Sequence, residues 1–430
     1  MKFKHHLLGD LIRVKHGFAF KSEYFSFESG EKIVLTPGNF YEEGGFKLRP
    51  NKDRYYSGDY PHDFLLKKND LIIAMTEQTY GLLGSPALIP ENNKYLHNQR
   101  LGKFELLRNN QVSVFFLYYL FHIKGLRDEI SNTASGTKIR HTAPERISKI
   151  KIPLPPLPIQ KKIAAVLSAY DDLIENNNRR IALLEKMAEE LYREWFVRLR
   201  FPGHDNVKII KGIPEGWEVG IIGNLFNVKS GYAFKSDDLG DMGHPIIKIT
   251  NIQNGFIDKV DVQRFSGNIH KRIAQFELMD GDFLIAMTGA QVGKTGLFMM
   301  SKERFFLNQR VGKFFHRLIN DNNIIFIKIF CQTNYFKSQI ENYAIGAAQP
   351  NISGAQIESI KILIPTENLL KRFSLLTKPF LQKIFSLKKQ NENLILFRDC
   401  LLSRLMSGSI DTENLDIRFP KSMMEEEGHG

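Results

Sequence analysis

The segment VKHGFAFKS at residues 14–22 recurs almost unchanged as VKSGYAFKS at residues 228–236. Three further blocks repeat in the same order. They are DLIIAMT (70–76) and DFLIAMT (282–288), NQRLGKF (98–104) and NQRVGKF (308–314), and ISKIKIPLP (147–155) and IESIKILIP (357–365). Their spacing of about 210 residues is far longer than the repeat of a solenoid. The chain is therefore predicted to hold two tandem copies of one domain, each with a connector.

Each copy begins with short segments typical of β-strands, separated by turns. LLKKNDLIIAMT (65–76) combines a turn with a buried strand, and ISKIKIPLP alternates in polarity until prolines end it. The stretch VSVFFLYYLFHIKGLRDEI (112–130) is typical of a helix. This mixture predicts that the chain belongs to the α+β class, with helices and strands combined in each of its two tandem α/β domains.

A segment with the pattern of a long helix follows each domain. Between Pro158 and Pro202 the chain has neither proline nor glycine, and apolar residues recur every three or four positions, as in a coiled coil. The second segment has a similar pattern but contains Pro379, which is expected to kink or interrupt the helix. Asn177 and Asn391 fall on seam positions, either as solvated residues or as residues that set the register.

The two helices are expected to pack on each other, because neither amphipathic rod is stable alone. A short connection to the second domain disfavours a parallel pair, so an antiparallel coiled coil with pseudo-twofold symmetry is predicted. Such a pair of domains resembles a dimeric reader of two DNA half-sites. The predicted boundaries are residues 1–156 (first domain), 157–200 (first helix), 201–365 (second domain), 366–407 (second helix) and 408–430 (flexible tail).

Composition limits the classes of function. Lys and Arg (59) outnumber Asp and Glu (47), which gives a net charge of +12 and favours a polyanionic partner without requiring one. Only Cys331 and Cys400 occur, so a disulfide framework or a multi-cysteine zinc module is excluded. The sequence shows neither a long apolar run nor a signal peptide, so a cytoplasmic protein without a membrane span is expected.

Catalytic motifs are not found. GAQVGKT (289–295) resembles a nucleotide-binding loop, but its glycines enclose three residues where that motif needs four. The only Pro-Pro pair, Pro155-Pro156, lies in a strand-end turn and not in an amino-methyltransferase motif. No spaced set of His, Cys and Asp suggests a metal, and nothing resembles a nucleophile elbow. The chain is therefore predicted to bind and to scaffold without a catalytic residue, metal or bound cofactor of its own.

Candidate DNA contacts come from the repeat itself. Lysines beside the glycine turns suit phosphate contacts, although the alternative is a turn packed by Phe20 and Phe234 with solvated lysines. The arginines of the NQR blocks either contact DNA or are structural. Three pairs of loops differ between the copies and are rich in side chains that pair with base edges. Their composition is also that of ordinary surface loops. The pairs are 36–46 and 250–256, 76–81 and 288–295, and 135–141 and 346–351. The candidates are Lys15, Lys21, Ser22, Asn39, Thr79, Tyr80, Arg100, Lys138, Arg140, Lys229, Lys235, Ser236, Asn251, Gln253, Gln291, Lys294, Arg310 and Gln349.

Taken together, these blocks resemble the specificity (S) subunit of type I restriction–modification enzymes. The resemblance also rests on IKIPLPPLPIQKKIAAVL, NNNRRIALLEKMAEELYREWF, GIPEGWEVG and LLSRLMSGSI, and covers nearly the whole chain. It implies two target recognition domains, each reading half of a bipartite, asymmetric site on double-stranded DNA, and helices that set the spacer. The first domain departs from the pattern at residues 76–84, which lack a Gly-Lys-Thr turn, so a contact by Lys294 is not carried over to it.

The resemblance also implies partners. Two methyltransferase (modification) subunits per chain would bring S-adenosylmethionine, and restriction subunits would join through the complex and bring ATP and Mg. Tyr192, Trp195 and Phe196 are candidates for docking a partner, and seam packing is the alternative. Two other functions stay open: a coiled-coil adaptor that binds only protein, and a standalone restriction or modification enzyme.

Overall fold

The structure is a computed structural model. It describes residues 3–27, 29–49, 52–78, 80–253, 255–299, 301–316, 323–344 and 350–424. The chain divides into two compact units: Met1–Asn176 with Gln390–Gly430 forms the first unit, and Asn177–Lys389 forms the second. Each unit combines one of the repeated domains with parts of both long helices, α4 (Leu157–Tyr192) and α10 (Glu367–Met406).

The first unit is built on small sheets that are antiparallel except where β4 pairs with β9 in parallel. Its main sheet has the order β2 (Ile12–His16), β10 (Leu101–Leu106), β6 (Leu71–Ala74), β8 (Pro86–Leu88), and a second has the order β3 (Phe25–Ser26), β5 (Tyr55–Tyr56), β4 (Lys32–Val34), β9 (Tyr95–Leu96). The two-stranded pairs are β1 (Lys4–Leu7) with β12 (Lys151–Leu154) and β7 (Thr76–Glu77) with β11 (Arg140–His141). The helices of the domain are α1 (Val114–Leu120), α2 (Lys124–Asn132) and α3 (Pro144–Ser148), and α11 (Lys421–Met424) lies near the end of the chain.

The second unit repeats this plan with longer sheets. Its main sheet has the order β16 (Phe226–Ser230), β25 (Val311–His316), β22 (Phe283–Ala286), β23 (Thr295–Leu297), β20 (Gly255–Ile257), β19 (Ile252–Gln253). The other strands are β17 (Leu239–Gly240), β21 (Arg264–Phe265), β18 (His244–Ile247), β24 (Phe306–Leu307), β15 (Glu218–Ile221) with β26 (Lys361–Ile364), and β13 (Ile209–Ile210) with β14 (Ile213–Pro214). The helices are α5 (Ile222–Leu225), α6 (Lys271–Ala274), α7 (Ile324–Phe330), α8 (Asn334–Ala344) and α9 (Gly354–Glu358).

The repeated blocks form equivalent pieces of the two units. In the first unit the register pairs Phe104 with Val14, and in the second it pairs Phe314 with Val228. A half-buried ion pair beside each main sheet is also duplicated: Lys103 contacts Asp70 at 2.6 Å, and Lys313 contacts Asp282 at 2.5 Å. The prediction of two tandem domains that mix helix and sheet is therefore confirmed by the folds of the separate units.

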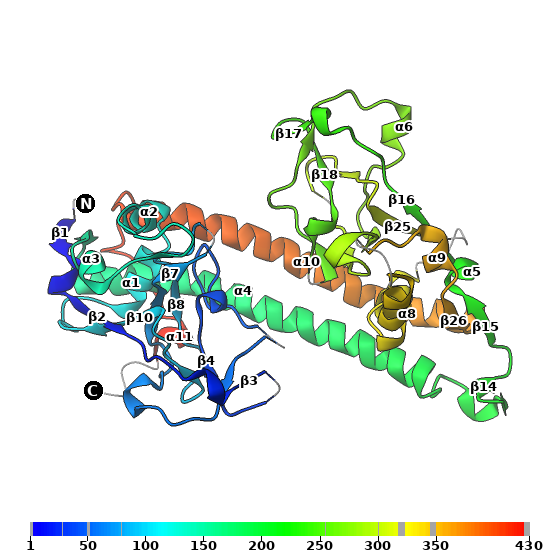
Figure 1. Ribbon diagram of the computed structural model, residues 1–430, viewed down its shortest axis with the longest axis horizontal. Helices are drawn as coiled ribbons and strands as arrows, with labels where there is room; N and C mark the ends of the chain where they lie inside the picture. Colours follow the sequence, from blue (N-terminus) through cyan, green and yellow to red (C-terminus); the bar gives the residue numbers. More distant parts are fainter. Residues whose placement is uncertain are drawn as a thin grey trace. The chain divides into compact units, whose positions relative to one another are not determined.

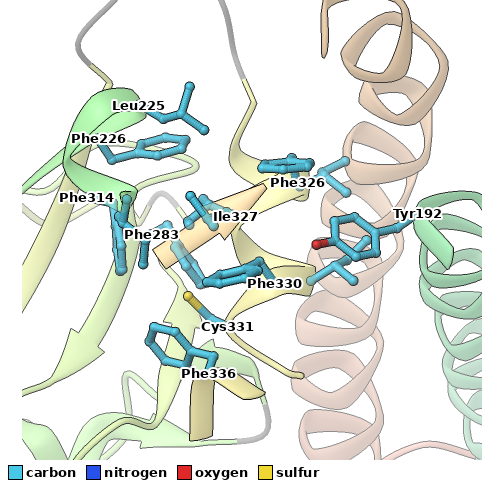
Figure 2. Packing of buried hydrophobic residues seen from close by; sticks show 14 of the residues in the cluster. Tyr192, Leu225, Phe226, Phe283, Phe314, Phe326, Ile327, Phe330, Cys331 and Phe336 are labelled. Atoms are coloured by element: carbon cyan, nitrogen blue, oxygen red, sulfur yellow. The ribbon is translucent and has the colours of Figure 1, made fainter. Parts of the chain in front are cut away.

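In each unit, apolar side chains of α4 and α10 join the domain core. In the first unit Ile163 and Leu167 belong to one buried cluster with Leu402 and Leu405. Figure 1 shows α4 and α10 as the two long helices of the chain. In the second unit Figure 2 shows Tyr192 beside Phe326 of α7, with ring centroids 5.4 Å apart. Burial of these apolar stripes stabilises helices that would otherwise be marginal.

The helices differ from the sequence expectation in two respects. Helix α10 continues through Pro379, so the prediction of an interruption at this residue is wrong. Pro379 has no N–H to bond the carbonyl of Leu375, one turn earlier. Both residues are exposed, so water can solvate this carbonyl group. Helix α4 passes into a π-helical turn, Arg193–Val197, and Leu199 then adopts a left-handed φ of 57°, which ends the helical run. None of the helices that the structure describes has both the length and the apolarity needed to cross a bilayer.

Candidate nucleic-acid interface

A polar groove in the first unit brings together all three loop regions that differ between the copies. The cavity has a volume of about 590 Å³. The three regions contribute Thr36, Pro37, Gly38 and 40–43, then Thr76 to Gln78, and finally Ile139. Arg100 comes from the first NQR block. Lys47, Arg49 and Arg54 add positive charge, while Glu42, Glu43 and Glu77 add negative charge. Residues far apart in the sequence thus share one concave, charged site.

Asn39 holds one of these loops in place. Its side chain is only 4% exposed, and Oδ1 accepts hydrogen bonds from the backbone N–H of Thr36 at 2.9 Å and from the Thr36 hydroxyl at 3.1 Å. Asn251 does the same in the second unit, where it accepts from the backbone N–H of Lys248 at 2.9 Å. These two asparagines are buried loop anchors, which corrects their assignment as side chains that face DNA; their amides are already committed to backbone groups.

Glu77 and Arg140 form a buried network under the loop 76–84. The Glu77 carboxylate accepts three backbone N–H groups of residues 81–83, and its Oε1 accepts from Nη1 of Arg140 at 3.0 Å. The guanidinium carbon of Arg140 lies 5.5 Å from the ring centroid of Tyr80, whose side chain is 62% exposed. The sequence reading missed Glu77, because its ionic partner lies 63 residues away in another loop.

The two arginines of the NQR blocks are presented alike. In the first unit, the backbone N–H of Arg100 donates to Oδ1 of Asn98 at 2.9 Å; in the second, that of Arg310 donates to Asn308 at 3.1 Å. Each asparagine thereby fixes a turn from which an exposed arginine side chain projects. Burial, and secondarily the nearby charge of Arg310, lower the pKa of Lys248, so two cations lie near each other in the second unit.

In the second unit, the loop 288–295 is joined through its backbone to residues 350 and 351, the described end of the loop 346–351. The N–H of Gly289 donates to the carbonyl of Pro350 at 2.8 Å, and Thr288 forms a β-bridge with Asn351. A cavity of about 600 Å³ is lined here by Lys294, Thr295 and Pro350, among others. A separate cavity of about 440 Å³ is lined by Lys248, Thr250, Asn251 and Gln263 together with Asp241, Asp261 and Val262. The copy-specific loops of this unit thus line two cavities.

The glycine turns of the first repeated block have a packing reason. A Cβ on Gly17 would lie 2.1 Å from the carbonyl oxygen of Asn98, and a Cβ on Gly231 would lie 2.2 Å from that of Leu307. Phe20 packs against Tyr56 with centroids 4.8 Å apart, and Phe234 packs against Phe265 at 5.0 Å. The alternative of a turn packed by Phe20 and Phe234 therefore describes the scaffold of this block.

The remaining candidate residues are distributed over the surface. Lys15 is half-buried, 3.8 Å from Glu105 and above the ring of Phe64, so its charge is partly occupied within its own unit. Lys229 lies over the ring of Phe315. Gln291 is half-buried. The exposed candidates are Lys21, Ser22, Lys138, Lys235, Ser236, Gln253 and Lys294. Thr79 and Gln349 lie outside the described residues.

The aromatic residues proposed for docking a partner belong to the core of the second unit. Tyr192, Trp195 and Phe196 are all buried, and Trp195 is only 5% exposed. The ring of Trp195 packs 5.8 Å from that of Phe373 on α10, and Phe196 packs 4.9 Å from Phe326 on α7. Direct docking through these side chains is therefore corrected to seam and core packing, since a partner cannot reach rings that are already covered.

Within the described ranges, no group of three His, Cys, Asp or Glu side chains is arranged to hold a metal ion. Whether the chain carries any cofactor stays a prediction.

The fold and the grooves define a class: a duplicated α+β protein whose two scaffolds agree while the loops that line their cavities differ. The family model of the type I restriction modification DNA specificity domain matches residues 2–186 and 214–395. The chain belongs to this family.

Individual relatives are distant. The type I restriction enzyme MjaIX specificity subunit of Methanocaldococcus jannaschii is 26% identical over 306 residues, which covers 70% of this chain and 70% of that protein. The MjaVIII specificity subunit of the same organism is 29% identical over 306 residues, covering 70% and 71%. The S subunit of a type I restriction–modification system from M. genitalium superposes with a TM-score of 0.57 at 18% identity, over 94% of this chain and 96% of that one, which shows a shared fold.

Proposed function

We propose that this chain is the DNA sequence-specificity subunit of a type I restriction–modification complex, and that each unit reads one half of a bipartite, asymmetric site on double-stranded DNA. One observation carries the proposal: the same scaffold occurs twice, and loops that differ between the copies line a cavity with charged and polar side chains in each unit. Equal scaffolds with unequal loops suit two different half-sites.

Exposed arginines and lysines at these loops would contact phosphates, while polar side chains of the groove walls would contact base edges. In the first unit, the residues suited to these parts are Arg100 in the groove, the exposed Lys138 next to Ile139 in the sequence, and the exposed Tyr80 against Arg140. In the second unit they are Arg310, Lys294 and Gln253. Because Asn39 and Asn251 are buried, they act by shaping the loops that present these side chains.

The long helices would act as the spacer between half-sites. Support comes from the direction of pairing inside each unit. In the first, Asp171 contacts Arg398 and Ile163 clusters with Leu405. In the second, Trp195 contacts Phe373, and Glu185 shares a small cavity with Ile384. As residue numbers rise on α4 they fall on α10, which is the pattern of an antiparallel coiled coil. We propose that this coiled coil gives the molecule its pseudo-twofold symmetry.

The chemistry would reside on partners. Two methyltransferase subunits would dock on each chain and supply S-adenosylmethionine, and restriction subunits would supply ATP and Mg for cleavage. This chain would then be non-catalytic and would act in the cytoplasm, where the DNA lies. Its contribution would be to choose which adenine-containing sites the complex modifies.

Domain exchange separates this function from its two alternatives. Residues 1–156 are replaced by the corresponding domain of another family member, and DNA methylation is mapped with the methyltransferase partner present. The proposal expects one new half-site, with the other half and the spacer length retained. A protein-binding adaptor would leave the methylated sequence unchanged, and a standalone enzyme would methylate DNA without a partner.

A further inference from the structure

Glu77 is an unusual residue to find in a DNA-reading groove. It lines the cavity of the first unit, yet its side chain is only 2% exposed. A carboxylate in this place repels phosphate, and burying it unpaired would be costly. It is retained by strong partners: Oε2 accepts the backbone N–H groups of Gly81 at 3.0 Å, Leu82 at 2.9 Å and Leu83 at 3.0 Å.

The second oxygen of Glu77 fixes Arg140. Oε1 accepts from Nη1 at 3.0 Å, and the two residues face each other in the antiparallel pair of β7 and β11. Nη2 of Arg140 donates to the carbonyl of Ser131, so the plane of the guanidinium is held at two edges. A rigid planar cation held in this way can support an aromatic ring, which an ammonium group on a flexible stem does less well.

Tyr80 is the ring that Arg140 supports. The guanidinium carbon lies 5.5 Å from its centroid, and the side chain is exposed at the edge of the same loop. One oxygen of Glu77 therefore orients the loop backbone, and the other orients Arg140, which supports the ring of Tyr80. An exposed aromatic ring can make an apolar contact with the edge of a base, such as the methyl group of thymine, and contacts to base edges carry sequence information.

The second unit fixes the equivalent loops differently. The position of Glu77 is taken there by Gly289, which has no side chain and whose N–H donates to the carbonyl of Pro350 at 2.8 Å. The backbone joins the two loops in both units, and in the first unit the side chain of Glu77 adds the bonds that hold Arg140 and the turn 81–83. A single substitution can therefore disturb one half-site and spare the other.

We propose that Glu77 is a positioning residue for sequence recognition in the first unit: through Arg140 and the turn 81–83, it holds the ring of Tyr80 against a base of the first half-site. This inference rests on the proposed function. It differs from a purely electrostatic view, in which removal of an acidic group beside DNA tightens binding to every sequence and leaves the preference unchanged.

The test uses the full chain in complex with its methyltransferase partner and a duplex library with both half-sites randomised. Glu77→Gln removes the charge but keeps the size of the side chain. Glu42→Gln is the matched control, because Glu42 lines the same groove on its exposed side. The measured quantity is the ratio of methylation at the preferred and mismatched sequences, determined separately for each half-site.

We expect Glu77→Gln to lower the ratio of the first half-site by about tenfold or more, the scale of a lost contact to a base edge, with the second half-site within twofold of wild type. Arg140→Gln should lower the same ratio, because it removes the guanidinium that lies against the ring of Tyr80. Glu42→Gln is expected to tighten binding to every sequence. The inference is overturned if Glu77→Gln does the same and leaves the methylation ratios of both half-sites unchanged.

Tyr80→Ala keeps the test decisive if Glu77→Gln prevents folding, since an exposed side chain can be removed without damage to the core. Retention of the first half-site preference in Tyr80→Ala contradicts the inference, and its selective loss supports it. A wild-type complex that shows no preference at either half-site would instead contradict the proposed function itself, so the two failures are distinguishable.

Discussion

Arg398 donates a hydrogen bond from Nη1 to Oδ1 of Asp171 across 2.7 Å. The hydroxyl of Tyr119 donates to the other oxygen of the same carboxylate at 2.6 Å. Asp171 lies on α4, Arg398 on α10 and Tyr119 on α1, so one carboxylate joins both long helices to the domain of the first unit. The second unit has Leu381 and Ala188 at the positions 210 residues away from Asp171 and Arg398, lining one small cavity.

This difference predicts a non-additive effect on stability. Arg398→Ala should lower the free energy of unfolding of the first unit by about 2 kcal/mol, because the Asp171 carboxylate loses a charged partner in a half-buried place. Asp171→Leu combined with Arg398→Ala copies the apolar pair of the second unit and should cost less than Arg398→Ala alone. Urea denaturation measures both, with Arg404→Ala on the exposed side of the same helix as control. Equal or additive losses would show that the carboxylate is not left unpaired.

Buried histidines predict that acid destabilises the first unit. Burial lowers the pKa of His97 and of His122 from 6.5 to about 4. Between pH 6.5 and 4 each histidine is therefore protonated in the unfolded chain but neutral in the folded chain. As the pH falls through this range, the free energy of unfolding should decrease by about 1.4 kcal/mol per pH unit for each histidine. The free energy of unfolding in urea is measured from pH 7 to 4. In His97→Leu it should depend less steeply on pH than in the wild type. Leucine is chosen because Leu307 occupies the equivalent position in the second unit. An unchanged slope would mean that His97 does not titrate in this way.

The repeated glycines predict a matched pair of opposite outcomes. Gly17→Ala should destabilise the first unit by about 3 kcal/mol or prevent folding, because its Cβ would collide with a backbone carbonyl that cannot move freely. Gly125, in α2, has no atom within 4 Å of an added Cβ, so Gly125→Ala should be neutral or stabilise by about 0.5 kcal/mol. Thermal unfolding of the two variants side by side provides the measurement. Similar melting temperatures would remove the packing reason for the repeat.

Arg310 predicts a phosphate contact that carries no sequence information. Arg310→Ala should weaken DNA binding of the complex by a similar factor for all duplexes and reduce the salt dependence of log Kd by about one unit of slope. Arg304→Ala is the control, because that guanidinium is held by Glu277 at 2.9 and 2.6 Å. Titrations at several salt concentrations decide the matter. A loss confined to one sequence would make Arg310 a base-reading residue instead.

The duplicated scaffold could be predicted from the sequence because its physical requirements leave a mark at fixed spacing. Gly17 and Gly231 recur since any Cβ would clash, and Asn98 and Asn308 recur since each holds the same turn. Helical periodicity likewise predicted α4 and α10, although not the continuity of α10 through Pro379.

The walls of the grooves could be predicted only as loops. Asn39 has the composition of a base-reading residue, and its burial depends on how residues 36–47 fold back. Glu77 gave no local signal, because its meaning depends on Arg140, which only the tertiary structure brings near. The sequence alone is compatible with Trp195 as a docking residue or as a core residue. Only the tertiary structure shows that its ring packs against Phe373.

The central claim is that each unit reads its own half of the target. The most direct measurement is a map of adenine methylation across the DNA of a host that carries the complex, with the wild-type chain and with residues 1–156 exchanged for the domain of another family member. The account predicts one bipartite asymmetric sequence for the wild type, and after exchange a sequence in which one half is new while the other half and the spacer are kept. A methylated sequence that stays unchanged, or that changes in both halves, would contradict it.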